Sequence, residues 1–86
     1  MFTFGEKISV FYNIMSAYHY HTTITVDGEI IIKSEYDDVF PDLVTKYDNI
    51  DKALIDWVFT LECNNQDNED DYWDYEIAFI KKLMQK

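Results

Sequence analysis

The stretch that decides the fold is His21-Thr-Thr-Ile-Thr-Val-Asp-Gly-Glu-Ile-Ile-Ile-Lys-Ser34. Two β-branched runs, 22–26 and 29–33, flank Asp27-Gly28, a dipeptide whose positive φ angles suit a tight turn, so the pattern predicts an antiparallel β-hairpin. A two-residue turn gives the expected cross-strand pairs Val26 with Glu29, Thr25 with Ile30, Ile24 with Ile31 and Thr23 with Ile32. An isolated hairpin is only marginally stable in water, so helices, with or without a third strand, must cover its apolar face.

The segment before the hairpin reads as an amphipathic helix that begins at Glu6, after an extended lead-in over residues 1–5. Its apolar positions follow helical spacing: Ile8, Phe11, Tyr12, Met15 and Tyr18. A strand over residues 8–14 is the alternative, because several residues there also favour strands.

Three further helices are expected after the hairpin. Pro41 suits the first position of a short helix over 42–46. The apolar residues around it are expected to close one end of the core: Tyr36, Val39, Phe40 and Leu43.

The next helix begins at Asp48 or Asn49, either of which can cap it, and Asp51 favours its positive N-terminal end. Its apolar stripe consists of Ile50, Leu54, Trp57, Val58 and Leu61. Asn64 and Asn65 are expected to end this helix.

Asn68 is the expected cap of the last helix. Its buried side should contain Tyr72, Trp73, Ile77, Ile80, Leu83 and Met84, and its other side Asp67, Asp70, Asp71 and Asp74. The predicted fold class is α+β, in a single domain over 1–86: an N-terminal helix, a hairpin, a short helix and two amphipathic helices packed on it.

The composition is rich in aromatic residues, with seven Tyr, six Phe and two Trp among 86 residues, which helps so short a chain to form a core. The formal net charge is −10, and it is unevenly distributed: −1 over residues 1–34, −12 over 35–76 and +3 over 77–86. All seven basic residues are Lys, so no guanidinium is available for phosphate or base contacts. We therefore expect neither direct nucleic-acid binding nor binding to anionic membranes.

The residues that could carry chemistry do not form a recognisable active site. A Ca²⁺ loop starting at Asp67 would have Tyr72 where the turn needs Gly and Ala78 where it needs Glu. His19 and His21 form a His-x-His pair with no further ligand spacing nearby. We expect no enzyme activity, no metal and no cofactor. The single Cys63 and the lack of a long apolar run fit a soluble cytoplasmic protein.

The densest acidic stretch runs from Asn64 to Glu76, where six acids and three aromatics fall within the ten residues from Asp67 onward. Mixed charges would give equal solubility without self-repulsion, so this concentration indicates a positively charged partner, such as a Lys/Arg-rich groove built for phosphates. Among the aromatics, we expect Tyr75 to contact the partner and Tyr72 and Trp73 to face the core.

These features resemble the small acidic phage-type anti-CRISPR proteins that inhibit type II CRISPR nucleases by imitating DNA. The resemblance rests on the Asp27-Gly28 turn with its following strand, the apolar stripe over 50–61 and the acidic run over 69–71 ahead of Tyr72 and Trp73. It implies a protein acting in the cytoplasm of a bacterial host. It also implies that the acidic run, with Asn64, Asn65 and Asp67, occupies the arginine pocket that reads the protospacer-adjacent motif, and that 27–29 reach a second surface near a nuclease site. A longer first helix and the expectation of only two strands depart from that family.

The leading interpretation is a non-enzymatic inhibitor of a DNA-handling enzyme, and the alternative is an immunity protein or antitoxin that neutralises a basic nuclease toxin. An accessory acidic subunit is a third option. The predicted partner-binding residues are Asn64, Asn65, Asp67, Glu69, Asp70, Asp71, Asp74, Tyr75, Asp27, Glu29, Glu35, Asp37 and Asp38.

Overall fold

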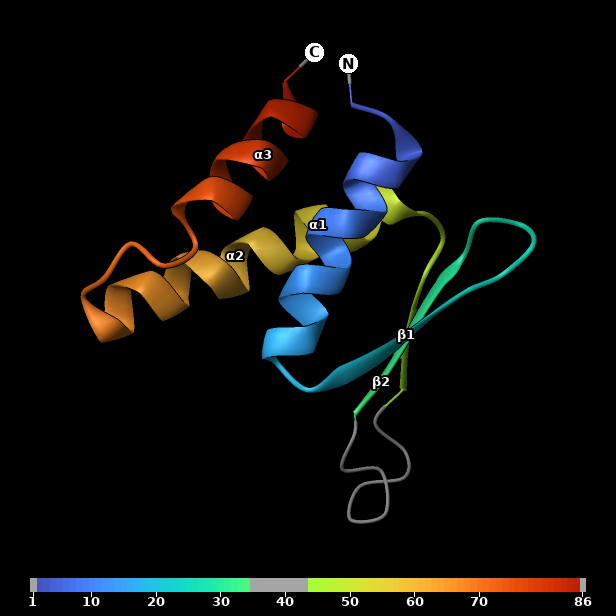
Figure 1. The fold of residues 1–86 in the computed structure, drawn as a ribbon, viewed down its shortest axis with the longest axis horizontal. Coiled ribbons are helices and arrows are strands. Elements are labelled where there is room, and N and C mark those ends of the chain that lie inside the picture. The colour runs from blue at the N-terminus through green and yellow to red at the C-terminus, as the bar shows by residue number, and fades with distance from the viewer. Residues whose placement is uncertain (1, 35–43, 86) are drawn as a thin grey trace. The chain divides into compact units, whose positions relative to one another are not determined.

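The computed structural model describes residues 2–34 and 44–85, which form three helices and a three-stranded antiparallel sheet (Figure 1). The elements are α1 (Phe4–Ala17), β1 (Tyr20–Ile24), β2 (Ile30–Ser34), β3 (Val44–Tyr47), α2 (Ile50–Asn68) and α3 (Asp74–Met84). The predicted α+β class is confirmed. The chain divides into two compact units, Met1–Ala53 and Leu54–Lys86; the single domain over 1–86 stays a prediction.

The N-terminal helix α1 starts earlier than the sequence predicted, because Thr3 caps it. The Thr3 hydroxyl accepts the backbone N–H of Glu6 at 3.1 Å, and the Glu6 carboxylate accepts the backbone N–H of Thr3 at 3.1 Å. This reciprocal pair satisfies two donors of the first turn. The predicted helix is therefore confirmed, whereas the extended lead-in through residue 5 and the alternative strand over 8–14 are wrong.

The buried face of α1 consists of Val10, Phe11, Ile14 and Met15. Tyr12, which the sequence placed on the apolar stripe, is exposed. Successive residues are about 100° apart around a helix, so a buried face centred on Phe11 and Ile14 turns Tyr12 towards solvent. Within the first unit α1 contacts β1.

The predicted hairpin is present as β1 and β2, but its register differs by one residue. Ile24 pairs with Ile30 and Thr23 with Ile31, in place of the expected Ile24–Ile31 and Thr23–Ile32 pairs. A shift of one residue moves every side chain to the other face. The observed register puts Ile24 on the same face as Ile30 and Ile32, both of which are buried.

The cause is a three-residue loop over 26–28 in place of the expected two-residue turn. The N–H of Gly28 donates to the Thr25 carbonyl at 3.0 Å, the N–H of Thr25 donates to the Glu29 carbonyl at 3.0 Å, and Gly28 has φ 87°. The Thr25 hydroxyl also accepts the N–H of Glu29 at 3.0 Å. A three-residue hairpin loop of this kind needs a left-handed final residue, which Gly28 supplies.

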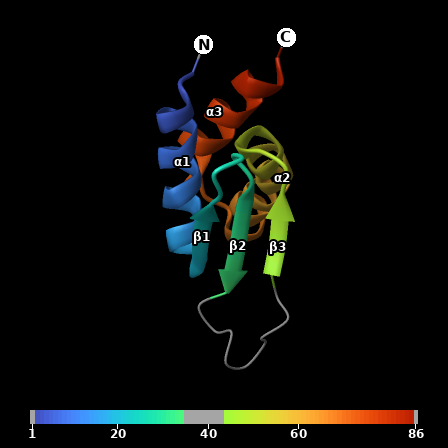
Figure 2. The same ribbon diagram turned by 90° about the vertical axis from the view of Figure 1, so that its right-hand side faces the viewer.

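The predicted short helix over 42–46 is wrong at its described residues, because 44–47 form the strand β3. β3 pairs antiparallel with β2, so the sheet order is β1-β2-β3 (Figure 2). Val-Thr-Lys-Tyr is a short run of β-branched and aromatic residues, and the edge of β2 gives it a partner. Residues 41–43, and the apolar residues expected to close the core at 36, 39, 40 and 43, lie outside the described residues.

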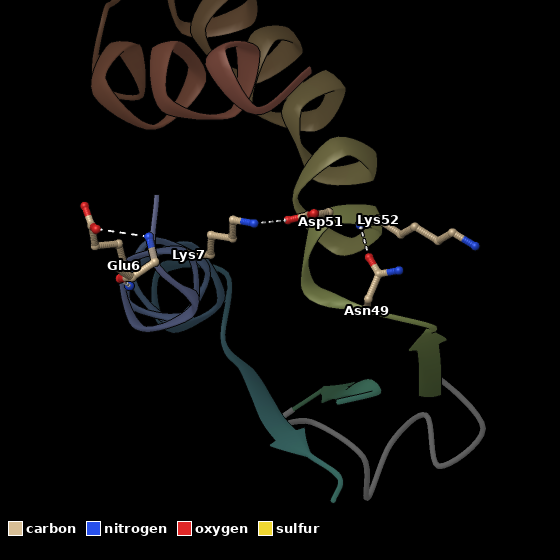
Figure 3. Close-up of polar contacts among 6 residues, drawn as sticks. Glu6, Lys7, Asn49, Asp51 and Lys52 are labelled. Carbon is tan, nitrogen blue, oxygen red and sulfur yellow. Dashed lines mark hydrogen bonds and ion pairs between the residues drawn. The ribbon is translucent and has the colours of Figure 1, made fainter. Parts of the chain in front are cut away.

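The first turn of α2 belongs to the first unit and is fixed by two polar contacts (Figure 3). Asn49 is the cap, since its side-chain oxygen accepts the backbone N–H of Lys52 at 2.9 Å. The Lys7 ammonium on α1 lies 2.9 Å from the Asp51 carboxylate. Asp51 therefore both complements the positive end of α2 and forms an ion pair with α1.

The predicted apolar stripe of α2 is confirmed, because all five of its residues are buried, together with Ala53. The predicted end of this helix is wrong: α2 continues through Asn64 and Asn65 to Asn68. Asn68 is thus the last residue of α2 and not the cap of the next helix. Its side-chain amide donates back to the Asn64 carbonyl at 2.9 Å and to the Asn64 side-chain oxygen at 3.1 Å.

The last helix, α3, begins at Asp74, preceded by Trp73 at the N-cap position without a side-chain hydrogen bond. Of its predicted inward residues, Trp73 and Ile80 are buried, Ile77 and Leu83 are half-buried, and Phe79 is an additional buried residue. Tyr72 and Met84 are exposed, which corrects the prediction for both. Tyr72 lies in the turn before α3, so helical spacing does not govern its direction. No helix in the described parts of the chain combines the length and apolarity needed to cross a bilayer.

Candidate functional site

The densest acidic stretch forms the connection between α2 and α3, and residues 67–74 are called the acidic turn from here on. Helix α2 ends with a pair of backbone bonds: the N–H of Glu69 donates to the Gln66 carbonyl at 3.2 Å and the N–H of Asp70 donates to the Asn65 carbonyl at 3.1 Å. Glu69 has φ 51°, in the left-handed region. This is the Schellman arrangement, with Glu69 at a position where glycine is the usual residue.

The side chain of Asn65 joins the end of α2 to the start of α3. Its amide nitrogen donates to the Asp74 carboxylate at 3.2 Å, and its oxygen accepts the backbone N–H of Trp73 at 3.2 Å. Within the turn, the N–H of Asp74 donates to the Asp71 carbonyl at 3.0 Å. The acidic turn is therefore held by hydrogen bonds, and Asn65 contributes through both its amide nitrogen and its amide oxygen.

Five exposed carboxylates lie on the acidic turn: Asp67, Glu69, Asp70, Asp71 and Asp74. None of them forms an ion pair within the described residues. The lysines that do form ion pairs there have other partners: Lys7 with Asp51, Lys46 with Glu29, Lys52 with Asp48 and Lys81 with Glu62. The acidic turn thus presents charge that the described lysines do not neutralise.

Helix-end electrostatics explain only part of this charge. Asp74 lies in the first turn of α3, where the positive end of the helix dipole favours a carboxylate. Asp67 and Glu69 lie at the opposite kind of end, the C-terminus of α2, and no basic residue is in its last turn. These two carboxylates are placed where the dipole disfavours them, so helix stability does not account for their presence.

Glu76, the sixth acid of this stretch, does not belong to the acidic surface. It is 8% exposed, in the first turn of α3, and one of its carboxylate oxygens, Oε2, has no hydrogen-bond partner among the described residues. Helical spacing indicates this burial, because Glu76 lies three residues after Trp73 and four before Ile80, both of which are buried. The accessible carboxylates of the run are therefore the five on the acidic turn.

The aromatics of the run differ in exposure. Tyr75 is 70% exposed, as a partner-contacting residue must be, and Trp73 is buried as predicted. Tyr72 is 71% exposed, with its ring edge-on to Trp73 at a centroid distance of 4.8 Å and an interplanar angle of 87°. The acidic turn and the residue that follows it therefore present two exposed tyrosines, Tyr72 and Tyr75, where the sequence predicted one.

The remaining predicted partner-binding residues lie elsewhere. Asp27 is exposed in the hairpin loop. Glu29 is half-buried, and its carboxylate lies 2.8 Å from the Lys46 ammonium, a hydrogen bond that raises the pKa of Lys46. Asn64 is half-buried and accepts hydrogen bonds from Asn68. The predicted residues at 35, 37 and 38 lie outside the described residues.

The histidines and the cysteine are dispersed. His19 has φ 62° and lies in the turn after α1, His21 is exposed on β1, and Cys63 is exposed on α2. Among residues 2–34 and 44–85, no three or more His, Cys, Asp or Glu side chains come together in an arrangement that could hold a metal ion. The acidic turn is thus an array of charges without metal-ligand geometry.

Comparisons with protein-family models, with curated proteins and with solved structures found no match to this chain.

Proposed function

We propose that this protein is a non-enzymatic inhibitor that imitates nucleic acid and blocks the DNA-binding groove of a CRISPR-associated nuclease of type II. The observation that carries the proposal is the acidic turn: five exposed carboxylates with no ion-pairing lysine among the described residues, two of them at a helix end that disfavours negative charge. A partner rich in Lys and Arg would supply the missing compensation.

In the proposed mechanism the acidic turn occupies the place of DNA phosphates. Carboxylates accept charge-assisted hydrogen bonds from guanidinium groups in bidentate geometry, as phosphates do. Arginines that read the motif beside the target would then be occupied before DNA arrives. The field of a chain with net charge −10 also accelerates the encounter with a positive groove.

The two exposed tyrosines supply apolar contact beside the charge. Tyr72 and Tyr75 flank the buried Trp73 in sequence and are both largely exposed. Tyrosine is enriched among residues that dominate binding energy, and its ring can stack on an arginine side chain. We propose that the carboxylates steer and orient the protein towards its partner, and that the tyrosines lower the rate of dissociation.

The test is inhibition of plasmid cleavage by a type II nuclease–guide RNA complex. The wild-type protein should inhibit, and the reversal Glu69→Lys, Asp70→Lys, Asp71→Lys should abolish inhibition while the circular dichroism spectrum stays unchanged, because all three side chains are exposed. Unchanged inhibition by this variant would exclude the acidic turn as the site. A pull-down from host extract tests the alternative function. Capture of a nuclease toxin, and not of a CRISPR nuclease, would favour an antitoxin.

A matched pair of variants separates the position of the charge from its total. Neutralising Glu69, Asp70 and Asp71 to amides changes the net charge by three units, and so do three lysines placed on the exposed face of α1: Ser9→Lys, Asn13→Lys and Ser16→Lys. If the acidic turn is the binding site, only the first set of substitutions should strongly reduce inhibition. Equal loss from both sets would mean that net charge alone is responsible.

A further inference from the structure

We infer that Asn65 is a positioning residue that holds the acidic turn in its binding conformation and does not itself contact the partner. This inference rests on the proposed function, because it concerns the same site. The sequence placed Asn65 among the partner-binding residues together with its neighbour Asn64. The hydrogen bonds of the acidic turn give the two residues different roles.

Asn65 uses both ends of its side-chain amide inside the protein. The amide nitrogen donates to the Asp74 carboxylate at 3.2 Å, and the amide oxygen accepts the Trp73 N–H at 3.2 Å. The side chain is half-buried, whereas the five carboxylates are exposed. An amide engaged in this way fixes the backbone of the turn and the rotamer of Asp74, so it acts through the carboxylates.

The turn needs such a residue because its own sequence does not favour one conformation. Glu69 adopts φ 51°, which disfavours any residue with a Cβ, and five like charges lie within eight residues. A loose acidic loop would have to be ordered by the partner, and immobilising its side chains on binding lowers the affinity. Bonds from Asn65 order the turn before binding.

The free protein provides the first test. Asn65→Ala removes both side-chain bonds but leaves its backbone carbonyl to accept the Asp70 N–H. We expect amide hydrogen exchange at Trp73 to accelerate about fivefold, the effect of losing one ordinary hydrogen bond, and ¹⁵N relaxation to show greater mobility over 69–73. Gln66→Ala, which removes an exposed amide from the next position, is the control. Unchanged exchange at Trp73 in the Asn65 variant would overturn the inference.

The second test gives opposite signs for positioning and for contact. Asn65→Asp adds a carboxylate, so a residue that touched a basic groove would bind more tightly after the change. A positioning residue would lose inhibition, because the new carboxylate replaces the donor to Asp74 and repels it. Tighter inhibition by Asn65→Asp would contradict the inference.

A charge-conserving exchange provides the rescue. The double variant Asn65→Asp, Asp74→Asn restores a donor–acceptor pair at the same place with the wild-type net charge. An aspartate at position 65 can still accept the Trp73 N–H, so the bond to residue 74 is the one tested. We expect the double variant to show wild-type mobility over 69–73 and to regain most of the inhibition lost by Asn65→Asp alone. Failure of the exchange to restore the turn would count against the role of this bond.

The two proposals fail in different experiments. If Asn65→Ala loosens the turn and wild-type protein inhibits no nuclease, the positioning of the turn holds and the proposed function is wrong. If wild-type protein inhibits and Asn65→Asp inhibits at least as well with an unchanged turn, the proposed function holds and the positioning role is wrong.

Discussion

The backbone N–H of Asp70 donates to the carbonyl oxygen of Asn65 across 3.1 Å, and the chain between them passes through Glu69 in the left-handed region. Helices commonly end in this way with glycine, which has no Cβ to disfavour a positive φ. Here a carboxylate occupies the position, at the negative end of the α2 dipole. The turn is therefore less stable than the same backbone would be with glycine at position 69.

Glu69→Gly should stabilise the protein and weaken inhibition. Relief of the left-handed strain stabilises the fold by about 1–2 kcal/mol. This exceeds the entropic cost of ordering a glycine on folding, about 0.5–1 kcal/mol. A net gain of about 0.5–1 kcal/mol corresponds to a rise in Tm of roughly 2–8 °C for a chain of this size, measurable by thermal denaturation.

Glu69→Ala is the control for this prediction. It removes the charge but keeps the strain, so its Tm should stay well below that of the glycine variant. A glycine variant no more stable than the alanine variant would show that φ 51° at Glu69 carries no strain.

Tyr75→Ala should weaken inhibition without unfolding the protein. The side chain is 70% exposed, so its removal should change stability by less than about 0.5 kcal/mol. An anchor residue lost from an interface typically raises Kd about tenfold, which calorimetry would detect. Phe59→Ala is the matched control, because Phe59 is 60% exposed in the same unit but is distant in sequence from the acidic turn, which Tyr75 directly follows. Equal effects from the two variants would remove Tyr75 from the interface.

Inhibition should weaken steeply with added salt. Exposed charges are screened over about 8 Å at physiological ionic strength, so association with a positive groove should slow as salt rises, while dissociation changes less. Stopped-flow association rates across a salt series would measure this. Salt-independent association would indicate an interface governed by the tyrosines.

Acid should destabilise the capped end of α1. The Thr3 backbone N–H that donates to the Glu6 carboxylate holds the pKa of Glu6 below its ordinary value of 4.5. A lowered folded-state pKa stabilises the fold above the unfolded-state pKa, and this stabilisation is lost as the pH falls through the folded value. Wild-type protein should therefore lose more stability than Glu6→Gln, whose amide keeps the capping box, when the pH falls below about 4.5. Parallel stability curves for the two proteins would contradict this.

The elements that could be predicted from sequence are those with strong local patterns. The apolar spacing in α1 and in the stripe Ile50 to Leu61 is long enough to identify a helix and its buried face. The hairpin follows from two β-branched runs around Asp27-Gly28, but this dipeptide suits both a two-residue and a three-residue loop. The three-residue loop sets the register, and it places Ile24 on the same face as the buried Ile30 and Ile32.

The elements that could not be predicted depend on partners distant in sequence or on unusual end residues. Residues 44–47 become a strand because β2 offers them an edge, and a run this short has no periodicity of its own. The end of α2 is set by Glu69, which adopts a conformation typical of glycine. The sequence has no glycine there to mark the helix end, and Asn64 and Asn65 were the nearest residues that commonly end a helix. The exposure of Asp67, Asp70, Asp71 and Asp74 was predicted, but on one side of a helix capped by Asn68. Residues 69–73 instead form the turn between α2 and α3, and this turn and the exposure of Tyr72 required the structure.

An inhibitor that imitates DNA through the acidic turn must compete with DNA for one groove of the nuclease. The most direct measurement is fluorescence anisotropy of a labelled duplex that contains the protospacer-adjacent motif, bound to a type II nuclease–guide RNA complex, during titration with this protein. We expect wild-type protein to release the duplex, and the variant with Glu69, Asp70 and Asp71 reversed to Lys to leave it bound. Release by both proteins, or a complex that holds this protein and the duplex together, would contradict the claim.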